Sequence, residues 1–308
     1  MASDDPSALQ VRPVSPESRS AALQLAFAYL SDEDRQRQIE SVASASAFGG
    51  NTWDGLFGAY RCGKLVGSIF SQVQPGKYAQ VWPPSLDRDE DPSTAISLLR
   101  AVVKWLEQQP VHMAQILSEV VTAVDEKPLC QGGFDYLTDL LYLVCQEEDF
   151  PPACSSSPLE FEPYDSQNHA RLAAIVSATY QHTLDCPKLN HVRQLDDVLD
   201  GYRATGEFSS NHWLIVRHEN HDVGCLLLAD HPRFENMELV YMGVIPAHRG
   251  RHWGADIARH AQSVALAAGR HRLVLAVDAS NGPAINMYAS VGFRAWDRRR
   301  VYYHVFSR

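Results

Sequence analysis

The sequence lacks the features that mark a membrane-spanning or disulfide-stabilised secreted protein. No stretch approaches the ~20 uninterrupted apolar residues of a membrane span. The first residues, Met1 to Pro6, are acidic and polar, so we expect no secretory signal there. The six cysteines lie far apart without a Cys-x-x-Cys pair, which argues against a disulfide scaffold and a structural zinc site. These absences predict a cytoplasmic protein with reduced thiols, no membrane partner and no metal.

Basic residues are scarce in the first half of the chain. Residues 1–150 carry 11 Lys and Arg against 21 Asp and Glu, whereas residues 151–308 carry 16 of each. The whole net charge of −10 therefore lies in the first half. Because phosphate neutralisation needs clustered Lys and Arg, we expect no nucleic-acid partner. Any polyanionic ligand should bind to the second half. The oligomeric state is not indicated.

The length and the order of predicted elements indicate two domains. A chain of 308 residues with 45% apolar content has room for two domains of ordinary size. Residues 146–158 are rich in acids, Pro and Ser and read as a linker, which predicts domains at 1–150 and 151–308. Each half repeats a strand, a helix, a hairpin, a strand, a helix and further strands. We predict an α/β (α+β) fold in which each domain has a mixed, mostly antiparallel sheet flanked by helices.

The turn between a strand at Glu238–Val244 and a helix from about Trp253 to Ala268 has the composition of an anion site. The first amides of a helix lack partners, and the helix dipole is positive at that end. Glycine lets the backbone approach a phosphate closely. The residues expected to hold the anion are Arg249, Gly250, Arg251, His252, Trp253, Gly254 and Ala255. His248 and His252 are four residues apart, but the first lies in the turn and no Glu accompanies them, so a metal site is not predicted.

A second informative block runs from Asn281 to Phe293. Ser280 or Asn281 can cap a short helix, Pro283 suits its first turn and Gly292 suits its C-terminal end. Asn281 and Tyr288 lie about two turns apart, so both can point toward one cleft. Two closing strands are expected at Phe293–Trp296 and Val301–Phe306, with Arg298 to Arg300 at a solvated turn between them.

Together the two blocks resemble the GNAT superfamily of acyl-CoA-dependent N-acyltransferases. The first is similar to its Arg/Gln-x-x-Gly-x-Gly/Ala signature, with Arg249 first, Gly254 last and His252 in place of the middle glycine. The second resembles the Asn-x-x-Ala-x-x-x-Tyr-x-x-x-Gly-Phe run that closes many GNAT domains. The resemblance covers roughly residues 159–308 and is only topological over 9–145. It implies two tandem GNAT-like domains, a plan similar to mycothiol synthase.

The resemblance implies that the second domain uses acetyl-CoA as co-substrate. The amides of residues 249 to 254 would hold the CoA diphosphate, and Asn281 and Tyr288 would face the same ligand. Met242, Gly243 and Val244 would pair with the pantetheine arm as an extra strand would. The acyl group would pass directly to the amine of a small molecule, without a covalent intermediate.

Three side chains are candidates for chemistry on the amine. Tyr288 is the candidate general acid for the departing thiolate, or it only packs and orders CoA. Glu238 is the candidate general base, or a structural carboxylate in an apolar strand, and Glu235 competes with it from an expected turn. Asp185 can bind a cationic amine, or belongs to an ordinary loop. No His and Asp at a recognisable spacing support a nucleophilic role for Cys186.

The first half lacks the anion turn. Between Trp82 and Thr94 it offers no glycine and four acids, which would repel a diphosphate and instead suit the first turn of a helix. This domain is expected to wall the acceptor pocket or to stabilise its partner. Two other functions stay open: a protein N-terminal acetyltransferase, and a non-catalytic acyl-CoA-binding module, which His252 keeps under consideration.

Overall fold

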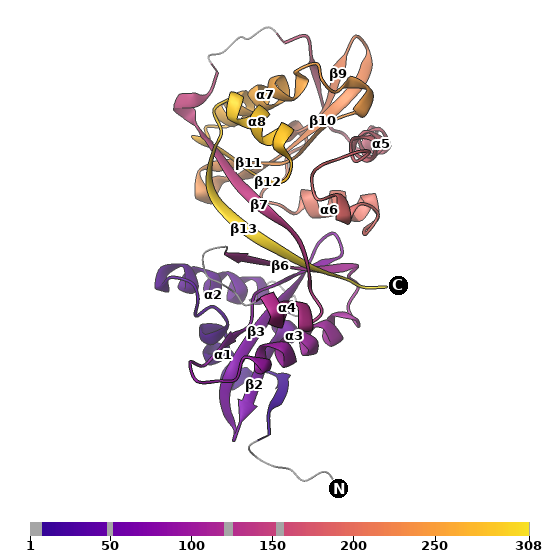
Figure 1. Ribbon diagram of the computed structural model, residues 1–308. Helices are drawn as coiled ribbons and strands as arrows, with labels where there is room; N and C mark the ends of the chain where they lie inside the picture. The colour runs from indigo at the N-terminus through magenta and orange to yellow at the C-terminus, as the bar shows by residue number, and fades with distance from the viewer. Residues whose placement is uncertain (1–7, 48–51, 120–125, 152–156, 308) are drawn as a thin grey trace. The chain divides into compact units, whose positions relative to one another are not determined.

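The computed structural model describes residues 8–47, 52–119, 126–151 and 157–307 (Figure 1). Its contacts divide the chain into two compact units. Unit 1 comprises Met1–Leu137 together with Arg300–Arg308, and unit 2 comprises Thr138–Arg299.

Unit 1 is a sheet with helices on both faces. Its strand order is β1-β2-β3-β4-β6, in which β4 and β6 are parallel and the other neighbours are antiparallel. The apolar side of α3 packs on one face and α1 on the other. The elements are β1 (Gln10–Pro13), α1 (Arg19–Ala26), α2 (Asp32–Ala47), β2 (Leu56–Arg61), β3 (Lys64–Gln74), β4 (Tyr78–Val81), β5 (Ser85–Leu86), α3 (Ser93–Leu106), β6 (Met113–Glu119) and α4 (Glu126–Gln131).

Unit 2 repeats this plan. Its strands follow the order β7-β12-β11-β10-β9-β8, in which only the pair β11 and β12 is parallel among those described. Helices α7 and α8 cover one face, and α5 and α6 pack on the other (Figure 1). The elements are β7 (Asp135–Gln146), β8 (Glu160–Pro163), α5 (His169–Thr179), α6 (Leu195–Arg203), β9 (Trp213–His218), β10 (His221–His231), β11 (Asn236–Val244), α7 (Trp253–Ala267), β12 (Arg272–Asp278), α8 (Gly282–Ser290) and β13 (Arg294–Val305).

These elements confirm the predicted fold class, a mixed and mostly antiparallel sheet with flanking helices. The hairpin between β9 and β10 turns at Glu219 and Asn220, which both have positive φ (47° and 64°). Such a two-residue turn matches the twist of the strands it joins. Helices α2, α4 and α6 were not predicted, because α2 and α6 are polar overall and α4 is short. No helix among the described ranges is both long and apolar enough to cross a bilayer.

The contact-defined division differs from a boundary at 150/151 because of two long strands. β7 begins in unit 1 but runs mainly in unit 2, where it pairs with β12 from Leu140↔Asp278 to Gln146↔Arg272. β13 runs the other way, and its last residues belong to unit 1, where the Phe306 amide donates to the His112 carbonyl. The last strand of each repeat thus completes the other unit.

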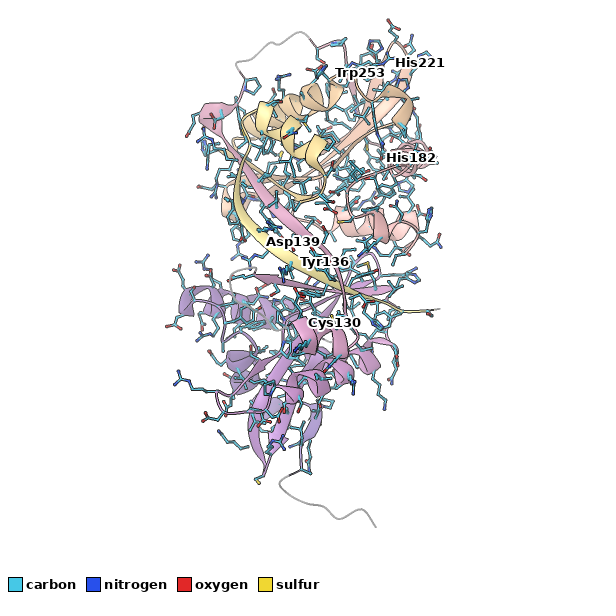
Figure 2. The ribbon with its side chains drawn as sticks, in the orientation of Figure 1. Cys130, Tyr136, Asp139, His182, His221 and Trp253 are labelled. Atoms are coloured by element: carbon cyan, nitrogen blue, oxygen red, sulfur yellow. The ribbon has the colours of Figure 1, made fainter. Side chains whose placement is uncertain are left out.

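The expectation of two closing strands was wrong. β13 is one strand of 12 residues, and Arg298, Arg299 and Arg300 lie inside it. Each has a carboxylate partner: Arg298 pairs with Asp139 (labelled in Figure 2), Arg299 with Asp297 and Arg300 with Glu126. Ion pairing therefore holds these arginines in a strand that their charge alone does not predict.

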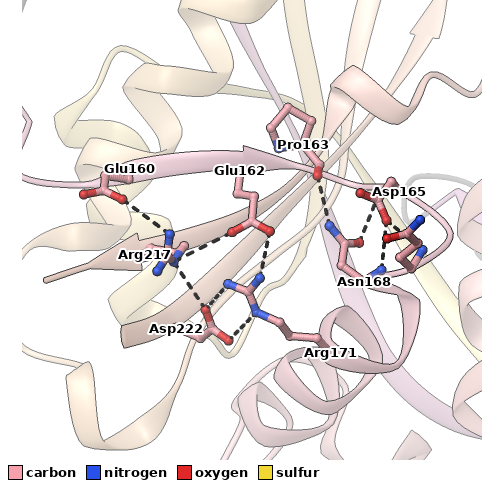
Figure 3. A network of polar contacts seen from close by, with 9 residues as sticks. Glu160, Glu162, Pro163, Asp165, Asn168, Arg171, Arg217 and Asp222 are labelled. Atoms are coloured by element: carbon pink, nitrogen blue, oxygen red, sulfur yellow. Dashed lines mark hydrogen bonds and ion pairs between the residues drawn. The ribbon is translucent and has the colours of Figure 1, made fainter. Parts of the chain in front are cut away.

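An ion network ties the outer strands of unit 2 to α5 (Figure 3). The Arg171 guanidinium donates to both carboxylate oxygens of Asp222 (2.8 and 2.5 Å) and to Glu162 (2.7 Å). Arg217 adds longer contacts to Glu160, Glu162 and Asp222. Hydrogen bonding to Arg171 holds the pKa of Asp222 below its ordinary value. The network fixes α5 on the sheet, and α5 leads into one wall of the candidate site.

We expect Arg171→Met to lower the free energy of unfolding at pH 7 by about 1 kcal/mol, since a half-exposed bidentate pair is lost. Folding lowers the pKa of Asp222. The ion pair therefore contributes its full stability above the pKa of the unfolded state, about 4, and this stability is lost as pH falls through the pKa of the folded state. Urea unfolding at pH 7 and pH 3 measures both effects. Arg259→Met removes a pair between neighbours on α7 and should cost only a few tenths of a kcal/mol. Equal losses in the two variants would contradict the assignment.

Candidate active site

The site begins where two parallel strands separate. β11 and β12 pair only over Asn236↔Arg272, Met237↔Leu273 and Glu238↔Val274. Beyond Glu238 the strands are no longer paired, and a cavity of about 730 Å³ opens between them. Its walls come from the second half of β11, the turn before α7, helix α8 and the loop after α5. Every residue predicted to bind the cofactor lines this cavity, as does Asp185.

The main chain of β11 has hydrogen-bonding groups free to face this gap. Ile245 donates its amide to the Val223 carbonyl of β10, and in an antiparallel pair such bonds recur at every second residue. Gly243 and Tyr241 are therefore turned to β10, while Met242 and Val244 are turned to the gap. The register breaks between Leu227 and Leu228, which leaves Val240 as a bulge beside the opening. The edge of β11 can thus accept an extended ligand.

The turn after β11 presents backbone amides at the start of α7. Gly250 has a φ of 79°, which is accessible to glycine at little cost. Within the described part of the chain, no acceptor is recorded for the amides of residues 250 to 254. The Arg249 amide, by contrast, donates to the Pro246 carbonyl. Of the amides predicted to hold the anion, those of residues 250 to 254 therefore remain available, and that of Arg249 does not.

His252 carries the departure from the expected glycine. It precedes α7 with a φ of 63°, in the left-handed region, and its side chain makes no capping hydrogen bond. A side chain in this region costs free energy that glycine does not. The sequence pattern anticipates a glycine there, and the conformation explains why.

The Arg249 side chain links two walls of the site, and its guanidinium binds carbonyl groups rather than facing the turn amides. Its guanidinium donates to the carbonyls of Val244 (3.0 Å), His182 (3.2 Å) and Thr179 (2.8 Å). These bonds tie β11 to the C-terminal end of α5, whose carbonyls lack helical partners. The positive charge left beside the turn is that of Arg251, which lies over the Trp253 ring at 5.1 Å from its centroid. Trp253 and His182 are labelled in Figure 2.

Helix α8 confirms the predicted local structure. The Asn281 side chain accepts from the Ala284 amide (3.3 Å), Pro283 lies in the first turn and Gly292 follows the helix with a φ of 94°. Tyr288 is 6% exposed and packs edge-on against Phe293. No hydrogen-bond partner is recorded for its hydroxyl among the described residues. Burial raises the pKa of Tyr288, and the charge of Asp185 adds to the shift, so the phenol keeps its proton at neutral pH.

Asp185 is held in place by the end of β12. Its carboxylate accepts from the Asp278 amide (2.9 Å) and from the Asn281 side chain. In return the Cys186 amide donates to the Asp278 carboxylate (3.0 Å). Although Asp185 is accessible from the open cavity, the surrounding protein raises its pKa by desolvation, and the charge of Asp278 contributes. The same causes raise the pKa of the Cys186 thiol, which opposes a nucleophilic role.

Glu238 lies at the apex of the gap, at the last paired position of β11. It is not among the described residues that line the cavity. Its carboxylate contacts the His231 ring (2.9 Å) on the neighbouring strand and raises the pKa of that imidazole. Glu235 lies in the preceding turn with a φ of 53°, as expected. No local sequence pattern pointed to His231, which meets Glu238 only through the pairing of β10 with β11.

Two further residues of the cavity were not anticipated. Tyr241 and Thr179 join their hydroxyls at 2.7 Å across β11 and α5, and both line the cavity. The Gly243 position lies against this threonine, since a Cβ there would approach Thr179 within 2.6 Å. Strand alternation predicts the face of Tyr241, but no local pattern pairs it with α5.

Unit 1 fills the corresponding position with its own side chains. The Trp82 ring stacks on Phe70 at 5.0 Å where the turn leaves β4. At the start of α3 the Asp91 carboxylate accepts from the Ser93 amide (2.7 Å), and Glu90 accepts from the Thr94 hydroxyl (2.6 Å). These carboxylates lie where an external anion would bind at the helix start. They precede α3, which begins at Ser93, so the expectation of acids within its first turn was wrong.

Residues 176–293 match the model of the acetyltransferase (GNAT) family, a range that contains the gap, the turn and α8. Residues 176–293 of unit 2 are a GNAT-family acetyltransferase domain. No curated protein matches the sequence. The described residues contain no group of three or more His, Cys, Asp or Glu that could hold a metal ion.

Solved structures extend the likeness over the whole chain. A GCN5-related N-acetyltransferase from Sphaerobacter thermophilus is 13% identical, with 98% of this chain and 96% of that one covered and a TM-score of 0.66. A tandem GNAT protein from the clavulanic acid biosynthesis pathway is 10% identical, with 98% and 99% covered and a TM-score of 0.52. At these identities the likeness concerns the fold, and it agrees with two GNAT-like units in tandem.

We expect His252→Gly to raise the free energy of unfolding by about 1 kcal/mol, because glycine adopts the left-handed region without strain. Urea unfolding of the ligand-free protein measures it. His248→Gly is the matched control, since His248 has no positive φ and glycine there should lower stability. Destabilisation by His252→Gly would show that the imidazole contributes more than its backbone costs.

Proposed function

We propose that the protein is an acyl-CoA-dependent N-acyltransferase that transfers acetyl from acetyl-CoA to the amine of a small molecule. The observation that carries the proposal is the gap between β11 and β12, which leads from unpaired amides at the start of α7 to the Tyr288 phenol. An open strand edge, an anion site and a proton donor are what a thioester of a phosphorylated carrier requires.

Acetyl-CoA would bind along one wall of the cavity. The amides of Gly250 to Gly254 and the Arg251 side chain suit the diphosphate. The main-chain groups of Met242 and the amide of Val244 suit the pantetheine amides, whereas the Val244 carbonyl is already bound by Arg249. A backbone N–H beside the Val240 bulge is positioned to stabilise the oxyanion of the tetrahedral intermediate. No metal is required in this scheme.

The transfer balances as one addition and one elimination. The neutral amine adds to the thioester carbon, the C–S bond then breaks, and the products are an amide and free CoA. The protonated Tyr288 phenol would supply a proton to the departing thiolate. After addition, the nitrogen would lose one proton to Glu238 directly or through water, since Glu238 lies at the apex but outside the cavity wall. Exchange with solvent would then return one proton to Tyr288 and remove one from Glu238. His231 would hold the Glu238 carboxylate in place.

The acceptor would bind on the α5 side of the gap. Asp185 is fixed there by Asp278 and Asn281, and its charge favours a cationic amine. We propose that the acceptor is a small molecule. A cytoplasmic location agrees with the free thiols of the five described cysteines.

Gly254→Asp should weaken acetyl-CoA binding by about 30-fold, because it places a carboxylate beside the amides proposed to hold the diphosphate, and like charges several ångströms apart cost about 2 kcal/mol at an effective dielectric constant near 20. Gly254→Ala is the control: a Cβ there meets Met287 and Met242 only at 3.6 to 3.8 Å, which is ordinary contact. Calorimetric titration compares the two variants with the parent protein. Unchanged affinity in Gly254→Asp would place the cofactor elsewhere.

Tyr288→Phe and Glu238→Gln should each lower kcat for thiol release by about 100-fold and leave acetyl-CoA affinity within threefold. Glu235→Gln removes a nearby carboxylate outside the site and should keep full turnover. Normal kcat in Tyr288→Phe would assign that ring to packing, and normal kcat in Glu238→Gln would assign that carboxylate to structure. Acetyl-CoA binding without thiol release for any amine would favour the non-catalytic binding module.

A further inference from the structure

Beside the gap, one face of the unit 2 sheet carries two aromatic side chains, of which Trp296 is exposed and Tyr142 is partly buried. Residues 141, 143 and 145 of β7 and residues 273, 275 and 277 of β12 face the core under α7 and α8. Tyr142, Ala276 and Glu238 alternate with core residues and therefore lie on the opposite face. Ala276 is the Cα partner of Tyr142, and Val274 is that of Glu238. This face is continuous with the cavity, because Ala276 lines it.

Trp296 of β13 joins Tyr142 on this face. The two ring centroids are 6.0 Å apart and the rings are nearly perpendicular (69°). Trp296 is 61% exposed, the largest exposed fraction among the large apolar side chains that the structure describes. We call Tyr142 and Trp296, with Ala276 between them and the cavity, the aromatic shelf. An edge-to-face pair with one open ring is a ready contact for a third flat group.

The charges around the shelf favour a cation on its cavity side. Burial raises the pKa of the Tyr142 phenol most. The charge of Arg299 lowers that pKa, and the charges of Glu238 and Asp297 raise it by less. The Arg299 guanidinium forms an ion pair with the Asp297 carboxylate, with an Nε–Oδ2 distance of 2.7 Å. Glu238, in contact with His231, lies at the apex of the gap, and Asp185 lines the cavity. An ammonium group would be attracted to the cavity end and an apolar group to the open end.

We propose that Tyr142 and Trp296 bind an aromatic group of the acceptor, so that the substrates are arylalkylamines whose amine reaches the gap across Ala276. The inference rests on the proposed function, and it adds the class of acceptor to it. The Ala276 methyl group lies between the Glu238 carboxylate and the two aromatic rings. This arrangement suits a molecule with a cation at one end and a flat apolar group a few bonds away.

Binding of 2-phenylethylamine and n-butylamine, measured by calorimetry on the acetyl-CoA-free protein, tests this inference without turnover. The parent protein should bind 2-phenylethylamine about 10-fold more tightly, and Trp296→Ala should remove most of that preference. Trp296→Phe should restore part of it. Leu266→Ala, an exposed position on α7, is the matched control and should keep the full preference.

Equal affinities for the two amines in the parent protein would overturn the inference, as would a preference that survives in Trp296→Ala. Loss of stability in Trp296→Ala without a change in amine preference would assign the ring to packing instead. Thiol release is measured separately with acetyl-CoA. A selective aromatic site without thiol release would refute the proposed transfer and leave the shelf standing, whereas thiol release without selectivity would do the reverse.

Discussion

The site of this protein depends on the point at which two parallel strands stop pairing. β11 and β12 share only three Cα partners, and the pairing ends at Glu238. Had it continued to the end of β11, the main-chain groups of Met242 and Val244 would be used in the sheet and no cavity could form there. Unit 1 illustrates the alternative, since β4 is paired with β6 along its whole length from Tyr78 to Val81. The open edge and the turn amides are thus consequences of the same early separation.

Once the strands separate, the gap has to be held open. Arg249 does so by binding three carbonyls from β11 and the end of α5, and the reciprocal bonds between the Asp185–Cys186 segment and Asp278 fix the opposite wall. Both devices use charged side chains on backbone groups, where a single hydrogen bond is stronger than a neutral one. The result is a cavity whose polar groups are positioned before any ligand binds, which reduces the cost of ordering them on binding.

Local patterns predicted the parts of this arrangement that depend on neighbours in sequence. The strand–turn–helix around Gly250, the Asn281 cap and the position of Gly292 all follow from the preferences of single residues. Contacts between distant segments were not predictable in this way. Arg298 meets Asp139 from 159 positions away, and that pairing turns an expected hairpin end into continuous strand. The passage of β7 and β13 between the contact-defined units likewise has no local signature, and the acidic segment does not indicate it.

The two units differ at the helix that follows the turn, where unit 2 has His252 in the left-handed region. In unit 1 the helix start is satisfied internally, because Asp91 accepts from the Ser93 amide and Glu90 from the Thr94 hydroxyl. In unit 2 the equivalent amides stay without recorded acceptors, and the backbone before them adopts a strained conformation that no capping bond of His252 repays. Strain of this kind persists where the surrounding structure imposes it, and it clusters at sites that bind ligands. The turn of unit 2 therefore leaves its amides without a partner from the described part of the chain, whereas its counterpart in unit 1 is satisfied by the chain's own carboxylates.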